Sequence, residues 1–66
     1  MTIVVNGQRH DVPDDATLTD AIARLTTAVR GVAVALNGSV VPRGQWHSTA
    51  LADADQIEIL TAVQGG

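Results

Sequence analysis

Short apolar runs separated by turn-forming pairs open the chain. The β-branched run at 2–5 (TIVV) leads into Asn6-Gly7, which is typical of a two-residue hairpin turn because both residues tolerate a positive φ. Residues 8–12 (QRHDV) are then the expected return strand. The start of the chain therefore predicts a β-hairpin.

A helical spacing follows at residue 17. Apolar residues recur at intervals of three and four and form one stripe: Leu18, Ile22, Leu25 and Val29. Thr17 is the expected N-cap, and Asp20 completes a capping box with it. Arg30 and Gly31 are typical of a helix C-terminus. The pattern predicts one amphipathic helix of about three turns.

The second half of the chain predicts three more strands. Residues 32–38 (VAVALNG) alternate large with small apolar side chains and end in a second Asn-Gly pair. Residues 39–46 (SVVPRGQW) are expected to continue as a short strand, which the proline limits to an edge. A loop over 47–54 follows, with Leu51 entering the core, and residues 56–63 (QIEILTAV) form the last strand.

One helix covers only one face of such a sheet. We therefore expect an α+β roll, a mixed sheet of four to five strands with one main helix on one face. Glu58 marks the solvent side of the last strand. The uncovered face is expected to carry these apolar residues: Val4, Ala33, Ala35, Leu60 and Ala62. Exposed apolar patches often mark docking sites, although apolar atoms also supply over half of any protein surface.

Size and composition exclude several classes of function. The 66 residues make one small domain with little room for a catalytic cavity beside its core. Four arginines against seven acidic residues give a net charge of −3, so we expect no nucleic-acid binding. The chain shows no membrane-spanning run and no signal peptide, which favours the cytoplasm. Cys and Lys are absent, so disulfide, cysteine-nucleophile and Schiff-base chemistry are excluded.

The polar clusters predict no active site. His10 lies beside an acidic turn at 11–15 (DVPDD), but the spacing matches no known metal site. Residues 53–58 (DADQIE) lack the central glycine and terminal glutamate of a calcium loop. His47 has a serine next to it in sequence only, which is no evidence for a nucleophile and its base. We expect no catalytic residue, metal or bound cofactor here, and the roles of His10 and His47 stay open.

The last residues carry the most informative motif. Gln64, Gly65 and Gly66 follow a domain at 1–63 and form a thin tail that can extend roughly 10 Å. Such a tail can enter a narrow channel in another protein, where the terminal carboxylate carbon has no side chain beside it. Activation by ATP as an acyl-adenylate would let a sulfur nucleophile convert this carboxylate to a thiocarboxylate.

The whole chain resembles the ubiquitin-like β-grasp sulfur carriers, and among them the ThiS family of thiamine biosynthesis. The resemblance rests on residues 35–46 (ALNGSVVPRGQW), 53–60 (DADQIEIL) and the terminal Gly65-Gly66. It implies that an E1-like, ThiF-like enzyme adenylates Gly66 with ATP. Sulfur from a donor such as a cysteine desulfurase would then form the thiocarboxylate, which serves a ThiG-like thiazole synthase. The uncovered sheet face would dock these partners, and we expect a monomer when the chain is free.

Three other functions stay open at this point. The small subunit of molybdopterin synthase has the same fold and tail chemistry but supplies sulfur to a pterin. Its chains are usually longer, and the VPRGQW segment is not typical of them. A ubiquitin-like protein modifier would be joined through Gly66 to lysines of its targets. A plain interaction domain would keep its function after deletion of Gly65 and Gly66.

Overall fold

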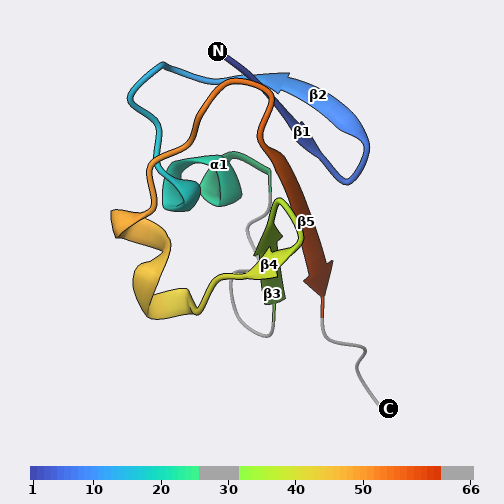
Figure 1. Cartoon of the computed structure of the whole chain (residues 1–66), viewed down its shortest axis with the longest axis vertical. Coiled ribbons are helices and arrows are strands. Elements are labelled where there is room, and N and C mark those ends of the chain that lie inside the picture. The colour runs from blue at the N-terminus through green and yellow to red at the C-terminus, as the bar shows by residue number, and fades with distance from the viewer. Residues whose placement is uncertain (26–31, 62–66) are drawn as a thin grey trace.

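The computed structural model describes residues 1–25 and 32–61, which form a mixed sheet and one main helix (Figure 1). The elements are β1 (Thr2–Val5), β2 (Gln8–Asp11), α1 (Leu18–Leu25), β3 (Val32–Leu36), β4 (Ser39–Val40), the 3-10 helix η1 (Arg43–Ser48) and β5 (Gln56–Thr61). The strand order is β2-β1-β5-β3-β4. The β1–β5 pair is parallel and the other pairs are antiparallel. The predicted α+β roll with up to five strands is confirmed.

Both Asn-Gly pairs form the predicted hairpin turns. Asn6 and Gly7 have φ angles of 49° and 82°, and Asn37 and Gly38 have φ angles of 50° and 86°. Two successive positive φ angles define a type I′ turn, whose twist matches that of the strands it joins. The first turn connects β1 to β2 and the second connects β3 to β4.

A capping box starts helix α1, as the sequence predicts. The Asp20 N–H donates to Thr17 Oγ1 at 3.4 Å, and the Thr17 N–H donates to Asp20 Oδ2 at 2.9 Å. Two backbone donors at the start of the helix are thereby satisfied. The predicted stripe residue Val29 and the predicted helix end at Arg30 and Gly31 lie outside the described residues.

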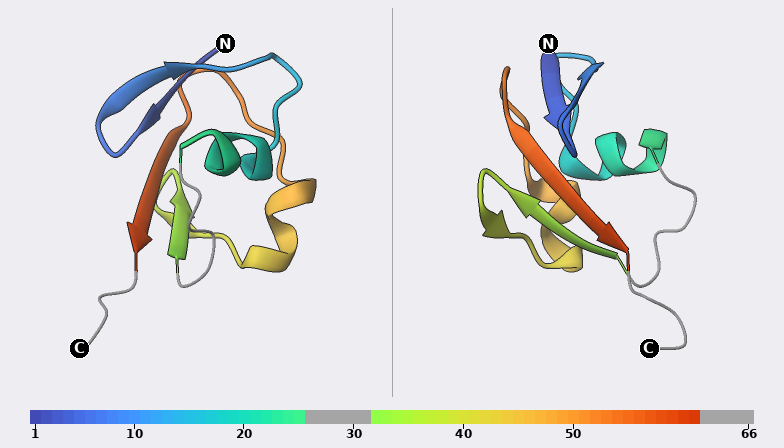
Figure 2. Two further views of the ribbon diagram at one scale, coloured as in Figure 1. Left: turned by 180° about the vertical axis from the view of Figure 1, so that it is seen from behind. Right: turned by 90° about the vertical axis from the view of Figure 1, so that its right-hand side faces the viewer.

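Helix α1 lies on one side of the sheet (Figure 2), and the core lies between α1 and the inner face of the sheet. The largest fully buried side chains come from both layers: Ile3, Leu18, Ile22, Val34 and Ile57. Leu51 is also buried, in agreement with its predicted role at the edge of the core. The alternation of the last strand is confirmed, because Ile57 is buried while Glu58 is exposed.

The segment after β4 corrects the sequence-based prediction of a strand over residues 39–46. Strand β4 ends at Val40, the Val41 N–H still donates to the Val34 carbonyl of β3 at 2.9 Å, and η1 begins at Arg43. Pro42 has no N–H to extend the sheet, and its carbonyl accepts from the Gln45 N–H at 2.8 Å to begin η1. The short helix turns the chain back toward α1, which a continued strand would not do.

Trp46, on η1, is buried with 4% of its surface exposed, and its Nε1–H donates to the Val41 carbonyl at 2.8 Å. Trp46→Phe would keep an aromatic ring in the core but leave this carbonyl without its donor. We expect the free energy of unfolding to fall by about 1–3 kcal/mol. Urea unfolding followed by circular dichroism measures this loss. An unchanged unfolding midpoint would contradict a stabilising role for the hydrogen bond.

Candidate functional site

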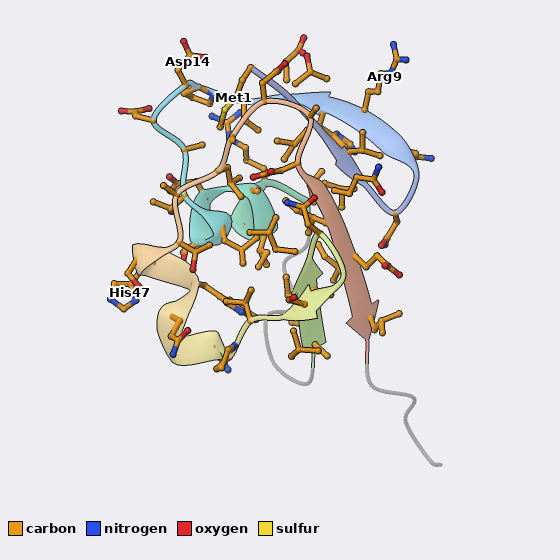
Figure 3. All side chains as sticks on the ribbon, viewed as in Figure 1. Met1, Arg9, Asp14 and His47 are labelled. Carbon is orange, nitrogen blue, oxygen red and sulfur yellow. The ribbon has the colours of Figure 1, made fainter. Side chains whose placement is uncertain are left out.

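The face of the sheet opposite α1 gathers residues from four strands. Cross-strand partners place their side chains on the same face, and successive residues of a strand alternate between faces. The register therefore gives one set on this side, which we call the open face: Val4, Ala33, Ala35, Val40, Gln56, Glu58 and Leu60. Arg9 pairs with Val4 and extends the open face onto β2, where Figure 3 shows its side chain pointing away from the molecule.

The structure places four of the five predicted docking residues on the open face. Leu60 is 62% exposed and Ala33 is also exposed, whereas Val4 and Ala35 are half-buried. The fifth, Ala62, lies outside the described residues. The sheet geometry of the four is thus as expected, and their docking role stays a prediction.

Val40 is the residue of the open face that the sequence analysis missed. It is 74% exposed and pairs with Ala35. A two-residue turn at Asn37-Gly38 fixes the register of its hairpin, so the partner of Ala35 follows from the sequence once the turn is recognised. Val40 and Leu60 are the large hydrophobic side chains that lie exposed within residues 1–25 and 32–61.

Two shallow hollows lie along the open face. The first, about 280 Å³, is lined by Val4, Asn6, Gly7, Gln56, Ile57 and Glu58. The second, about 340 Å³, is lined by Thr2, Val4, Arg9, Asp53 and Ala54. In the second lining, the Thr2 hydroxyl donates to Asp11 Oδ1 at 2.9 Å, and Asp53 Oδ1 accepts from the Thr2 N–H. No polar or charged side chain is buried in the described part of the chain. Val4, on the open face, lines both hollows.

The acidic turn near the start of the chain binds the chain's own amino group. Asp14 Oδ1 lies 2.9 Å from the Met1 nitrogen, and this hydrogen bond raises the pKa of the amino group (Figure 3). His47 lies apart from this turn, on η1. Within the described ranges, no three histidine or acidic side chains are grouped so that they could hold a metal ion.

The other acidic turn also uses its carboxylates for backbone amides. Asp53 Oδ1 accepts from the Thr2 N–H, and Asp55 Oδ2 accepts from the Ala52 N–H, each at 2.8 Å. These side chains therefore stabilise the entry into β5. The Ser48 hydroxyl donates to the Gln45 carbonyl at 3.1 Å, within the 3-10 helix η1. This hydrogen bond gives the Ser48 side chain a structural role.

Strand β5 connects the open face to the predicted reactive end of the chain. It lies between β1 and β3, and its last residue, Thr61, pairs with Val32. The exposed Leu60 is therefore one residue from the end of the described strand. Gln64, Gly65 and Gly66 lie beyond the described residues. Among the helices that are described, none has the length and hydrophobicity to cross a membrane.

Comparison with known proteins identifies the family. The ThiS family model matches residues 2–66. The sulfur carrier protein ThiS of Escherichia coli is 32% identical over 66 residues, which cover all of both chains. A thiazole synthase of Magnetococcus marinus is 36% identical over 66 residues, which make up 20% of its length.

Solved structures agree with this assignment. The crystal structure of the thiamine biosynthesis protein ThiS from Geobacter metallireducens is 32% identical, covers all of both chains and superposes with a TM-score of 0.82. The same fold is therefore shared over the full length of both chains. The chain belongs to the ThiS family, the sulfur carriers of thiamine biosynthesis.

Proposed function

We propose that Gly66 is the residue that carries sulfur in this chain, as a C-terminal thiocarboxylate that supplies the thiazole of thiamine. The observation that carries this proposal is the family match over residues 2–66, which includes both terminal glycines. The sheet supports it, because β5 leads directly from the open face toward that end. Residues 1–63 would form the domain, and residues 64–66 the tail that enters the partner.

Loading would take two steps. First, an oxygen of the Gly66 carboxylate attacks the α-phosphorus of ATP, and pyrophosphate leaves. Sulfide then attacks the carbonyl carbon of the acyl-adenylate, the bond from this carbon to the AMP oxygen breaks, and AMP leaves with the electron pair. Neither step changes the oxidation state of the sulfide. Where a cysteine desulfurase is the donor, two thiols would first reduce its persulfide to sulfide and form a disulfide. Glycine suits this chemistry because it has no Cβ to obstruct either attack.

The chain would act as a co-substrate of other enzymes and have no active site of its own. We propose an E1-like, ThiF-like adenylating enzyme, a sulfur donor such as a cysteine desulfurase, and a ThiG-like thiazole synthase as its partners. The last is supported by the thiazole synthase that contains a matching 66-residue segment. Because loading consumes ATP, we place it in the cytoplasm.

The open face is the surface that we propose for docking these partners. Its two large exposed side chains, Val40 and Leu60, would form the apolar centre of the contact. Arg9, on the edge strand β2, would lie at its polar rim, as is typical of protein interfaces, whereas Glu58 would lie inside the contact, opposite Ala35. Contact so near the end of β5 would direct the tail into the partner's active site.

Intact mass spectrometry tests the proposal. The chain is incubated with ATP, the E1-like enzyme and a sulfide source, and fragmentation then locates any change in mass. We expect replacement of one oxygen by sulfur, confined to Gly66. An unchanged mass, with an enzyme that loads a control carrier, would refute the proposed chemistry.

A further inference from the structure

The end of β1 leaves one edge of β5 without a neighbouring backbone. The parallel ladder runs from the Val4 N–H, which donates to the Asp55 carbonyl, to the Asn6 N–H, which donates to the Ile57 carbonyl, both at 2.9 Å. The chain then turns away at Asn6-Gly7. The next β5 residue that faces this edge is Ile59, and no backbone group of β1 reaches it.

The side chain of Asn6 replaces the missing peptide group. Its Oδ1 accepts from the Ile59 N–H at 2.9 Å, and its Nδ2 donates to the Ile59 carbonyl at 3.2 Å. A primary amide can do both because it presents an acceptor oxygen and donor hydrogens side by side. The ladder is thus extended by one pair of hydrogen bonds after the chain has left the sheet.

The hydrogen bonds between Asn6 and Ile59 extend the part of β5 that has a bonded neighbour on both of its edges. Up to Ile59, the strand has partners on its β1 side and pairs with β3 on the other side. Beyond Ile59, the described pairing is with β3, through Ala33 opposite Leu60 and Val32 opposite Thr61. Within the described part of β5, Asn6 therefore lies at the last point at which the strand is held from both sides.

We propose that Asn6 is a positioning residue for sulfur loading: by holding Ile59, it fixes the direction in which β5 presents Gly66 to the adenylating enzyme. This rests on the proposed function of Gly66. If β5 opened at Ile59, only a fraction of molecules would present the tail and Leu60 together in the binding geometry. The apparent affinity of the enzyme for the carrier falls in proportion to that fraction.

Asn37 offers a matched control, because it makes an equivalent contact at the other end of β5. Its Oδ1 accepts from the Gln56 N–H at 3.0 Å, and its backbone N–H donates to the Gln56 carbonyl at 2.7 Å. Asn37 is also the first of the two central residues of a type I′ turn. Its φ angle is 50°, and that of Asn6 is 49°. The two residues thus differ in the end and the edge of β5 that they hold, and Asn37 Nδ2 also donates to Asp55 Oδ1 at 3.0 Å.

The experiment compares Asn6→Gly with Asn37→Gly. Glycine adopts the positive φ of both turns without strain, so each variant keeps its hairpin and loses only the side-chain amide. Amide hydrogen exchange is measured by NMR, and adenylation by ATP–pyrophosphate exchange as a function of carrier concentration. Both variants are assayed at a temperature at which their spectra show them folded.

We expect Asn6→Gly to speed exchange of the Ile59 amide by about tenfold or more, since that amide loses its acceptor. The KM for the carrier should rise about three- to tenfold, with kcat unchanged. Asn37→Gly should speed exchange of the Gln56 amide instead and leave the KM within about twofold of the wild-type value.

If the two variants have equal KM values and the wild-type chain is adenylated, the positioning role of Asn6 is wrong, while the proposed function of Gly66 stands. A wild-type chain that is not adenylated at Gly66 would overturn the proposed function, and the role of Asn6 with it. If Asn6→Gly does not fold, Asn6→Asp replaces it. The aspartate keeps an acceptor for the Ile59 N–H but sets an oxygen against the Ile59 carbonyl, so the KM should rise here as well. An unchanged KM would again refute the role.

Discussion

Deletion of Gly65 and Gly66 is expected to abolish thiocarboxylate formation and to leave the fold unchanged. The shortened chain ends in the carboxylate of Gln64, which is displaced by roughly 7 Å from the position of the original end. A displacement of about 1 Å at a reacting group can already cost about a hundredfold in rate. Intact mass after incubation with ATP, the E1-like enzyme and sulfide should therefore show no added sulfur.

The control for this deletion is Gln64→Ala, which keeps the length of the tail and both glycines. We expect this variant to be loaded as the wild-type chain is. Circular dichroism and the urea midpoint of the deleted chain should match those of the wild type, because the deletion removes no residue of the core described within 1–25 and 32–61. A truncated chain that still gained sulfur would show that the reacting carboxylate is not that of Gly66.

Leu60→Glu is expected to weaken binding to the adenylating enzyme and to thiazole synthase by about 30-fold or more, the effect of losing an interface hot spot. Leu60 is 62% exposed, so little core packing is lost and the free energy of unfolding should change by less than about 1 kcal/mol. The new carboxylate would lie at the apolar centre of the open face, on the same side of β5 as Glu58. Titration calorimetry measures the affinity for each partner.

Ala23→Glu provides the matched control for charge. Ala23 is exposed on α1, so the substitution adds the same charge on the opposite side of the sheet. We expect its affinity for both partners to stay within about twofold of the wild type. If Ala23→Glu and Leu60→Glu weakened binding equally, the effect would come from net charge, and the docking role of the open face would be wrong.

Local chemistry made much of the fold predictable from the sequence. The Asn-Gly pairs require positive φ angles and so fixed both turns, while Thr17 and Asp20 fixed the start of the helix. The alternation around Glu58 assigned each residue of the last strand to one face. Each of these features depends on residues a few positions apart, which a sequence displays directly.

Part of the candidate site was also predictable, because it too depends on residues that are close together in the sequence. The two terminal glycines and the composition pointed to chemistry at the main-chain end, and the strand phases placed Leu60 on the uncovered face. Val40 could also have been placed opposite Ala35 from the sequence, because the two-residue turn at Asn37-Gly38 sets the register of its hairpin. The helical path through Trp46 depends on a cavity for the indole under α1, which no local pattern encodes.

What only the tertiary structure decided is which strand edges have partners. A period of two in the sequence tells which face of a strand is buried, but it carries no information about its neighbours in the sheet. The order β2-β1-β5-β3-β4 brings the first and last strands together, and the bond from Asn6 to Ile59 joins residues 53 positions apart. The sequence by itself determined the turns and the faces and indicated the proposed reactive end, because these features are local. The support that holds the strand leading to that end depends on long-range pairing, so it emerges only when the chain is folded.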